Sequence, residues 1–277
     1  MFPVRKLTSY PGRQGFPTWS PDSKFIVFQH TDMYDTLGGN GLWKISAEGR
    51  DIIQIFSGVA EHPKWSPDGK YIVFDADTGR SIRMIAAEGG KIIKFLPETV
   101  QIQNGSLPCW SPDGSCIAFV EGKNMSLCTW NFKTGELKSL FSEPGKVPLP
   151  GGWWTDGKSI LAGLMDLKTR KSVILRIYTD GKEAEQIVCD HENFYRHLAL
   201  SPDGSLLIFA ALEDNYLGLY IMLSDGGKSL PLAVSKDSHN EAAVWSPDGK
   251  SIAFSRSGNS GILIMDVDIN KIKEKLR

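Results

Sequence analysis

The stretch Trp65-Ser66-Pro67-Asp68-Gly69, followed by Tyr71-Ile72-Val73-Phe74, decides the fold of this chain. Ser, Pro and Gly at the first, second and fourth positions are typical of a type I turn, after which Gly takes a positive φ. The β-branched and aromatic run that follows predicts a short buried strand. The stretch therefore predicts two strands joined by a tight turn.

The same motif occurs six times, with substitutions in some copies. We call the first residue of each copy its anchor; the anchors are Trp19, Trp65, Trp110, Trp153, Leu200 and Trp245. They are separated by 46, 45, 43, 47 and 45 residues. A repeat this regular over the whole chain indicates a repeat architecture.

Each repeat also contains a second, weaker hairpin pattern. In the first repeat an apolar run at residues 42–45 is followed by Gly49 and by a second apolar run at residues 52–55. Such a pattern predicts a β-hairpin, so each repeat holds two hairpins. Four strands in one repeat match the size of a propeller blade. We predict an all-β, six-bladed β-propeller with four antiparallel strands per blade, in a single domain spanning residues 1–277.

The two ends of the chain suggest how the ring closes. Residues 2–7 precede the first anchor, where the other repeats have their outer strand, so they are expected to complete blade six beside residues 262–267. Residues 272–277 have a helix-forming composition, with Ile272 and Leu276 on one face. We expect a tail or a short helix there.

The six blocks, with their Gly-containing hairpins behind them, resemble the TolB-like propeller repeat. The resemblance covers essentially the whole chain and implies the six-bladed fold. Departures are local: Ser23 replaces the turn glycine in the first copy, Trp154 and Thr155 replace Ser-Pro in the fourth, and Leu200 replaces Trp in the fifth. Because many unrelated activities occur on propellers, the resemblance implies little about function.

Composition excludes several classes of partner. Lys plus Arg number 31 against 32 for Asp plus Glu, and no basic block stands out, so a nucleic-acid partner is not expected. The apolar runs have strand length, so no membrane span is expected. The N-terminus has no apolar signal core. The location is cytoplasmic if the chain is complete, and periplasmic or secreted if a signal peptide was removed. The oligomeric state stays open.

The four cysteines are Cys109, Cys116, Cys128 and Cys189, and they form no CxxC pair. Cys109 and Cys116 flank one turn, so a cross-strand disulfide between them is an alternative to buried free thiols.

The propeller topology separates two faces of the ring. The Ser-Pro-Asp-Gly turns lie on one face, which we call the turn face, and the residues that precede the anchors lead to the other, which we call the channel face. The repeated Trp, Ile and Phe positions are predicted to be core. The turn aspartates, such as Asp68, are predicted to bond to nearby backbone rather than to take part in catalysis.

Polar side chains gather just ahead of the anchors and differ from blade to blade. The candidate binding residues are Glu61, His62, Arg196, His197, His239, Asn240 and Glu241. The long loop at residues 29–41 and His191 are expected nearby. This cluster is the feature of the sequence that indicates a functional site.

The sequence contains no GxSxG elbow, HExxH motif, P-loop or dinucleotide fingerprint. Some TolB-like propellers precede a peptidase domain, but no nucleophile domain is expected in these 277 residues. The first hypothesis is therefore a non-enzymatic scaffold without a cofactor, which binds a protein or peptide partner through its funnel and channel-face loops.

The alternative follows from a resemblance to oligogalacturonate lyases. It implies a saccharide ligand and a divalent metal such as Mn or Ca, held by His62, His197 and His239 with help from Glu61 or Glu241. His62 and His197 are expected to face each other across the channel, because blades two and five are opposite.

Overall fold

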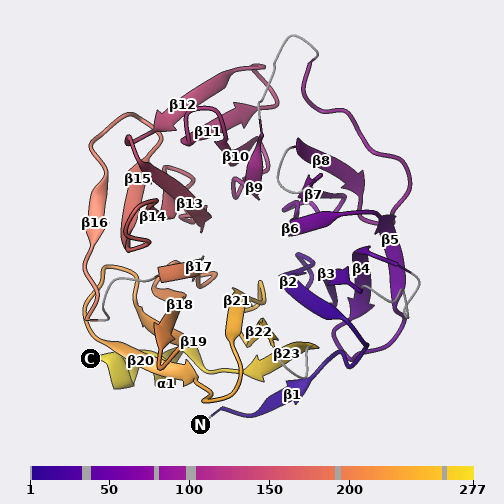
Figure 1. The fold of residues 1–277 in the computed structure, drawn as a ribbon, viewed down its shortest axis with the longest axis vertical. Helices are drawn as coiled ribbons and strands as arrows, with labels where there is room; N and C mark the ends of the chain where they lie inside the picture. Colours follow the sequence, from indigo (N-terminus) through magenta and orange to yellow (C-terminus); the bar gives the residue numbers. More distant parts are fainter. Residues whose placement is uncertain (1, 33–38, 78–80, 98–103, 191–194, 258–260) are drawn as a thin grey trace.

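The computed structural model describes residues 2–32, 39–77, 81–97, 104–190, 195–257 and 261–277. Six antiparallel sheets are arranged as a ring of six blades (Figure 1). Blade one consists of β2 (Arg13–Trp19), β3 (Phe25–Thr31), β4 (Gly41–Ser46) and β5 (Ile53–Ser57). Blade two consists of β6 (Ala60–Trp65), β7 (Tyr71–Ala76) and β8 (Ser81–Ala86), and blade three of β9 (Ser106–Trp110), β10 (Cys116–Glu121), β11 (Ser126–Asn131) and β12 (Leu137–Phe141).

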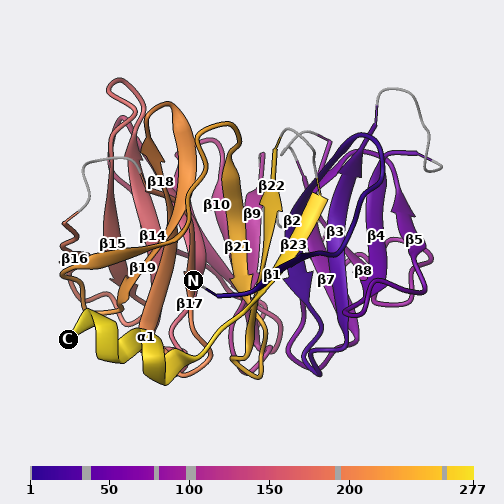
Figure 2. The same cartoon turned by 90° about the horizontal axis from the view of Figure 1, so that it is seen from below.

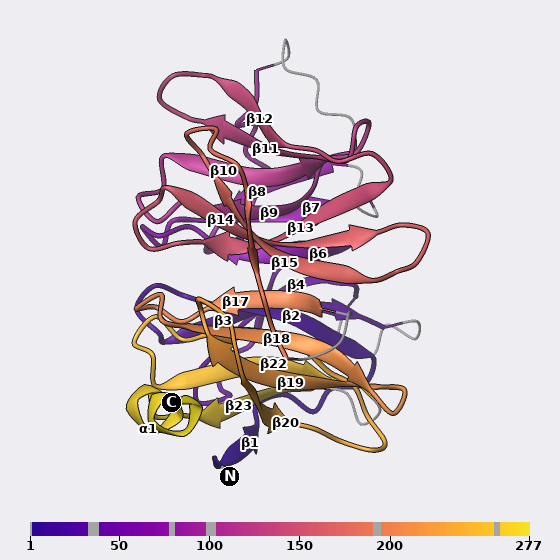
Figure 3. The same cartoon turned by 90° about the vertical axis from the view of Figure 1, so that its left-hand side faces the viewer.

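The other half of the ring follows the same order. Blade four consists of β13 (Lys146–Trp153), β14 (Ser159–Asp166), β15 (Ser172–Tyr178) and β16 (Glu185–Ile187). Blade five consists of β17 (Tyr195–Leu200), β18 (Leu206–Glu213), β19 (Tyr216–Leu223) and β20 (Ser229–Ala233). Blade six consists of β21 (Asn240–Trp245), β22 (Ser251–Arg256), β23 (Gly261–Asp266) and β1 (Val4–Lys6). The first strand of each repeat lies nearest the centre of the ring, and the strands run between its two faces (Figures 1 and 3).

Blade two differs from the prediction of four strands. Its sheet has three strands among the described residues, and the segment after β8 makes one isolated bridge, between Met84 and Ile93. Ile93, Phe95 and Leu96 still pack against the core beside β8. The apolar run at residues 92–95 therefore covers the blade edge without forming a regular strand.

The predicted closure of the ring by the N-terminal segment is confirmed. β1 pairs antiparallel with β23, with Val4 opposite Met265 and Lys6 opposite Leu263. Just after β1, the backbone N–H of Leu7 donates to the carbonyl of Ile262 at 2.8 Å. Blade six thus contains strands from both ends of the chain, which joins the first and last repeats.

The C-terminal residues form the short helix α1 (Ile269–Leu276), as the sequence suggested. Asp268 caps its N-terminus by accepting hydrogen bonds from the backbone N–H groups of Asn270 and Lys271. Ile272 and Leu276 are buried against blades five and six. The helix lies along the turn face, as Figure 2 shows, where the Lys273 ammonium contacts Asp203 of a turn at 2.8 Å.

The Ser-Pro-Asp-Gly turns have the predicted structural role. In blade two the N–H of Gly69 donates to the carbonyl of Ser66 at 3.0 Å, and Gly69 has a φ of 75°. The Asp68 carboxylate accepts from the Ser66 hydroxyl at 2.6 Å and from the Lys70 N–H at 3.0 Å. Ser23 takes the positive φ in the copy that lacks glycine. The turn aspartates therefore hold the turns together.

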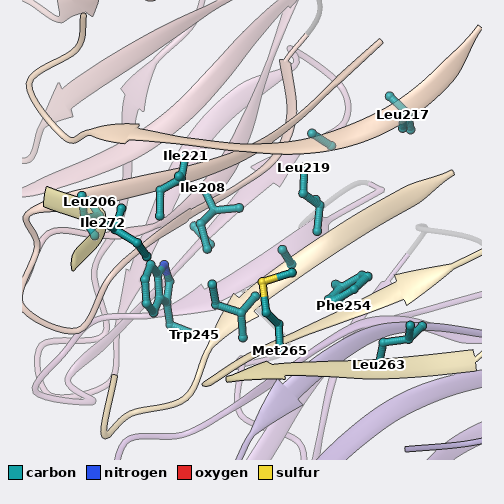
Figure 4. Close-up of a cluster of buried hydrophobic side chains, with 14 of the residues drawn as sticks. Leu206, Ile208, Leu217, Leu219, Ile221, Trp245, Phe254, Leu263, Met265 and Ile272 are labelled. Carbon is teal, nitrogen blue, oxygen red and sulfur yellow. The ribbon is translucent and has the colours of Figure 1, made fainter. Parts of the chain in front are cut away.

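The core lies between adjacent blades. The aromatic residue nine positions after five of the anchors is fully buried; these residues are Phe28, Phe74, Phe119, Phe209 and Phe254. Figure 4 shows the cluster between blades five and six, where Trp245, Ile208 and Met265 pack together. Each blade thus buries its faces against its neighbours, which stabilises the ring as a whole.

All four cysteines are free thiols, so Cys109 and Cys116 are not bridged. Within the described part of the chain, no helix has the length and apolar character needed to cross a membrane.

Candidate ligand-binding site in the central channel

A recurring irregularity shapes the inner wall of the ring. In every blade the pairing of the first and second strands shifts a few residues ahead of the anchor. At this point five first strands hold a non-glycine residue with a φ of 48° to 55°: Phe16, His62, Leu107, His197 and Ala242. Such bulges bend a strand and redirect its side chains, and they are frequent next to functional sites.

These bulges border a central cavity of about 470 Å³. All six first strands contribute to it, and four of the predicted site residues line it: Glu61, His62, Arg196 and His197. Asp75 and Met165, from the ends of β7 and β14 farthest from the turns, also line it. Because no Ser-Pro-Asp-Gly residue borders the cavity, it lies on the channel-face side of the ring.

Three aromatic rings meet in the channel. The Phe16 ring lies 4.1 Å from the His62 ring and 5.6 Å from the His197 ring, measured between centroids. His62 and His197 come from opposite blades, as expected. Phe16 of blade one contacts both rings.

His62 is held by a buried carboxylate. Its Nδ1 lies 2.8 Å from Oδ2 of Asp75, and the other carboxylate oxygen accepts the backbone N–H of Leu107 at 2.8 Å. Burial raises the pKa of Asp75, and these hydrogen bonds oppose that rise. Asp75 therefore orients His62 and connects blade two to blade three.

His197 lacks such a hydrogen bond at Nδ1 among the described residues. Its Nδ1 lies 4.0 Å from Glu241, and that carboxylate accepts a hydrogen bond from Arg13 at 3.1 Å. Burial lowers the pKa of His197 to about 3, and electrostatic interactions with His62, Arg196, Lys64 and Arg13 contribute to that lowering. The imidazole of His197 is therefore neutral at physiological pH.

Three of the predicted site residues, His239, Asn240 and Glu241, do not line the cavity. The Nδ1 atom of His239 accepts the backbone N–H of Leu217 at 3.1 Å, and its ring packs against Tyr216. Asn240 is fully buried; its side chain accepts from Arg256 at 2.7 Å and donates to the carbonyl of Ala233 at 3.2 Å. His239 and Asn240 hold blade six against blade five. Glu241 lies beside the cavity rather than in its wall, while Glu61 in the wall accepts from Gln29.

The donor set does not fit a metal bound jointly by His62, His197 and His239. His239 lies outside the cavity, where its Nδ1 accepts a backbone N–H, so it does not share a site with His62 and His197. Among the residues that the structure describes, no group of three or more His, Cys, Asp or Glu side chains is arranged to hold a metal ion. Residues 33–38 of the loop predicted near the site, and His191, lie outside the described residues, while residues 29–31 of that loop belong to β3.

Sequence reasoning missed most of the cavity wall, including Phe16, Lys64 and Asp75. A signal for the bulges was present, because Pro17, Pro63 and Pro108 each stand two residues before an anchor. Proline inside a strand pattern indicates a bulge or an edge.

Comparisons with known proteins agree with the fold. No family model matches the chain. A protein of Bacillus subtilis (strain 168), described as the uncharacterized peptidase YuxL, is 31% identical over 151 residues, which is 53% of this chain and 21% of that protein. The chain spans about a fifth of the length of the curated relatives it matches.

Solved structures match over nearly the whole chain. A proposed TolB from Agrobacterium tumefaciens has a TM-score of 0.68 at 20% identity, covering 96% of this chain and 94% of that one. An oligogalacturonate lyase from Vibrio parahaemolyticus has a TM-score of 0.64 at 13% identity, covering 97% and 94%. At such identities the likeness concerns the fold alone. It confirms that the chain has the TolB-like six-bladed propeller fold.

Proposed function

We propose that this propeller is a non-enzymatic scaffold that binds a peptide segment of a partner protein in its central cavity, from the channel face. The observation that carries the proposal is the cavity itself. Its volume of about 470 Å³ lies within the range of about 300–1,000 Å³ that is common for ligand pockets.

The wall of the cavity has the mixed chemistry that recognition of a peptide needs. Phe16, Leu107 and Met165 offer apolar surface, while Glu61 and Arg196 offer charge. Because the side chain at the bulge varies around the ring, with Phe, His, Leu and Ala among five blades, one orientation of a ligand would be preferred over the others. The turn face repeats one hydrogen-bonded motif in five blades and offers little such variety.

Fixed positions of the wall residues also favour binding. Asp75 holds His62, and the bulges hold the backbone beneath the side chains. A pre-formed site loses less conformational entropy when its ligand binds.

The test is selection of binding peptides from a random library by the immobilised protein. We expect wild-type protein to enrich a family of peptides, and the double variant His62→Gln/His197→Gln to lose them. Glutamine keeps an N–H that can donate to Asp75, so the variant should remain folded. The control is Asp68→Asn/Asp113→Asn on the turn face, which should select the same peptides. Binding that survives the histidine changes but fails in the turn-face control would contradict the proposal.

A saccharide ligand is the competing hypothesis. The likeness to oligogalacturonate lyases, one of them solved in complex with manganese, motivates it, but the described residues offer no group of three or more His, Cys, Asp or Glu side chains arranged to hold a metal ion. The same proteins can be titrated with trigalacturonate, and binding of that sugar in place of peptides would favour this alternative.

A further inference from the structure

Lys64 is a basic side chain in the cavity wall whose charge nothing nearby neutralises. Its backbone is fixed by pairing with Val73 and by the Trp110 indole, which donates to its carbonyl at 3.2 Å. Its side chain borders the cavity. Among the described residues, its ammonium group has no hydrogen-bond or ion-pair partner.

The carboxylates around the cavity are already engaged elsewhere. Asp75 accepts from His62 and from a backbone N–H, and Glu61 accepts from Gln29. Glu241 is bound by Arg13. None of these acids lies within ion-pair distance of Lys64, so the partly buried amine borders the cavity without a paired carboxylate.

The groups that face Lys64 do not replace a counter-ion. Cys109 of β9 is a buried thiol whose pKa is raised to about 12 by burial, so it carries no charge at neutral pH. Asp75 acts on Lys64 only through space, and His197, which is neutral at physiological pH, supplies no counter-charge. Burial is the largest effect, and it lowers the pKa of Lys64.

We infer that Lys64 recognises a carboxylate of the bound segment, either an Asp or Glu side chain or a C-terminal carboxylate. This inference deepens the proposed function and rests on it. A partly buried amine without a partner is unfavourable, and a carboxylate entering the cavity would remove that cost through a charge-assisted hydrogen bond. Peptides that carry an acidic residue at the right position are therefore the partners that this cavity fits.

The affinity for such a peptide should depend on pH. A bound carboxylate stabilises the protonated amine and so raises the pKa of Lys64 above its value in the free protein. Binding then takes up a proton whenever the free amine is partly deprotonated. Affinity should consequently fall as the pH rises through the pKa of Lys64 in the free protein.

The experiment compares peptide selection by four proteins: wild type, Lys64→Met, Lys64→Arg and the control Lys70→Met. Lys70 is an exposed lysine in the adjacent turn, so its replacement changes the net charge equally without touching the cavity. We expect wild type and the control to enrich peptides containing Asp or Glu at one position. Changing that residue to Asn or Gln should weaken binding about 10- to 100-fold, the loss expected for one charge-assisted hydrogen bond. Lys64→Met should abolish this difference, and Lys64→Arg should retain part of it.

The other outcomes show whether the role of Lys64, the peptide-binding function, or both are wrong. If wild type selects peptides without an acidic preference, or if Lys64→Met keeps that preference, the role of Lys64 is wrong while peptide binding stands. If no peptide is selected, the four proteins are titrated with trigalacturonate and with succinate. Binding that depends on Lys64 would keep the carboxylate site and overturn the peptide function; binding that does not, or none at all, would overturn both. A melting temperature of Lys64→Met near that of wild type shows that the variant is folded.

Discussion

Replacing Trp245 with alanine tests whether the anchors hold neighbouring blades together. Trp245 ends β21, is 5% exposed, and packs between blades five and six with Ile208 and Ile272 (Figure 4). Removing a buried tryptophan costs the transfer free energy of the indole and leaves a cavity, together about 3–5 kcal/mol. Because domains of this kind are stable by only about 5–15 kcal/mol, the variant should lose a large share of its free energy of unfolding.

The assay is urea unfolding followed by far-ultraviolet circular dichroism, with the free energy of unfolding extrapolated to water. Trp65→Ala is the matched control, because Trp65 is an anchor that is only partly buried and whose indole donates to the Gly69 carbonyl at 3.0 Å. We expect a smaller loss there, about 1–3 kcal/mol. A loss below about 1 kcal/mol for Trp245→Ala, or a larger loss for Trp65→Ala, would refute the assignment of the inter-blade core.

Two further predictions concern closure and acid stability. Deleting residues 1–8 should lower the melting temperature more than deleting residues 269–277. The first deletion removes β1 and opens the ring, whereas the second removes α1, which packs on the turn face. The opposite ranking in a thermal melt would contradict closure of the ring by β1. Hydrogen bonds from Ser111 and Ser115 lower the pKa of Asp113 to about 2, so this carboxylate should stabilise the fold above pH ~4 and lose that contribution as the pH falls toward 2. The urea midpoint of Asp113→Asn should accordingly fall less than that of wild type between these pH values, and equal falls would contradict the turn-stabilising role of the aspartate.

The repeat was readable from sequence because each blade needs the same local solution. The Ser66–Gly69 turn bonds to itself and the apolar run ending at Phe74 packs on the next blade, so both leave a pattern that recurs at every copy. The outer edge of blade two was predicted less accurately, because the expected fourth strand is not formed among the described residues. Residues 92–95 have the apolar composition of a strand, but packing of Ile93 and Phe95 onto the core does not require ladder pairing.

The site was predictable only in part, because its residues are defined by contacts across the ring. The histidines ahead of the anchors indicated the cavity, and His62 and His197 do line it. His239 also precedes an anchor, but by six residues rather than three, and its Nδ1 accepts the backbone N–H of Leu217 at the start of β19 instead of facing the cavity. Asp75 follows a predicted strand and gave no sign of its role, since its partners, His62 and Leu107, lie 13 and 32 residues away.

Locating a bound peptide is the most direct test of whether peptides bind in the cavity on the channel face. A peptide selected by the protein would carry a nitroxide spin label, and the broadening of assigned methyl signals would be measured by nuclear magnetic resonance. We expect strong broadening of the methyl signals of Leu107, Leu149 and Met165, which line the cavity. We expect little broadening of Ile269, which lies against a turn on the opposite face. Broadening of Ile269 with the three cavity methyl signals unchanged would contradict binding in the cavity.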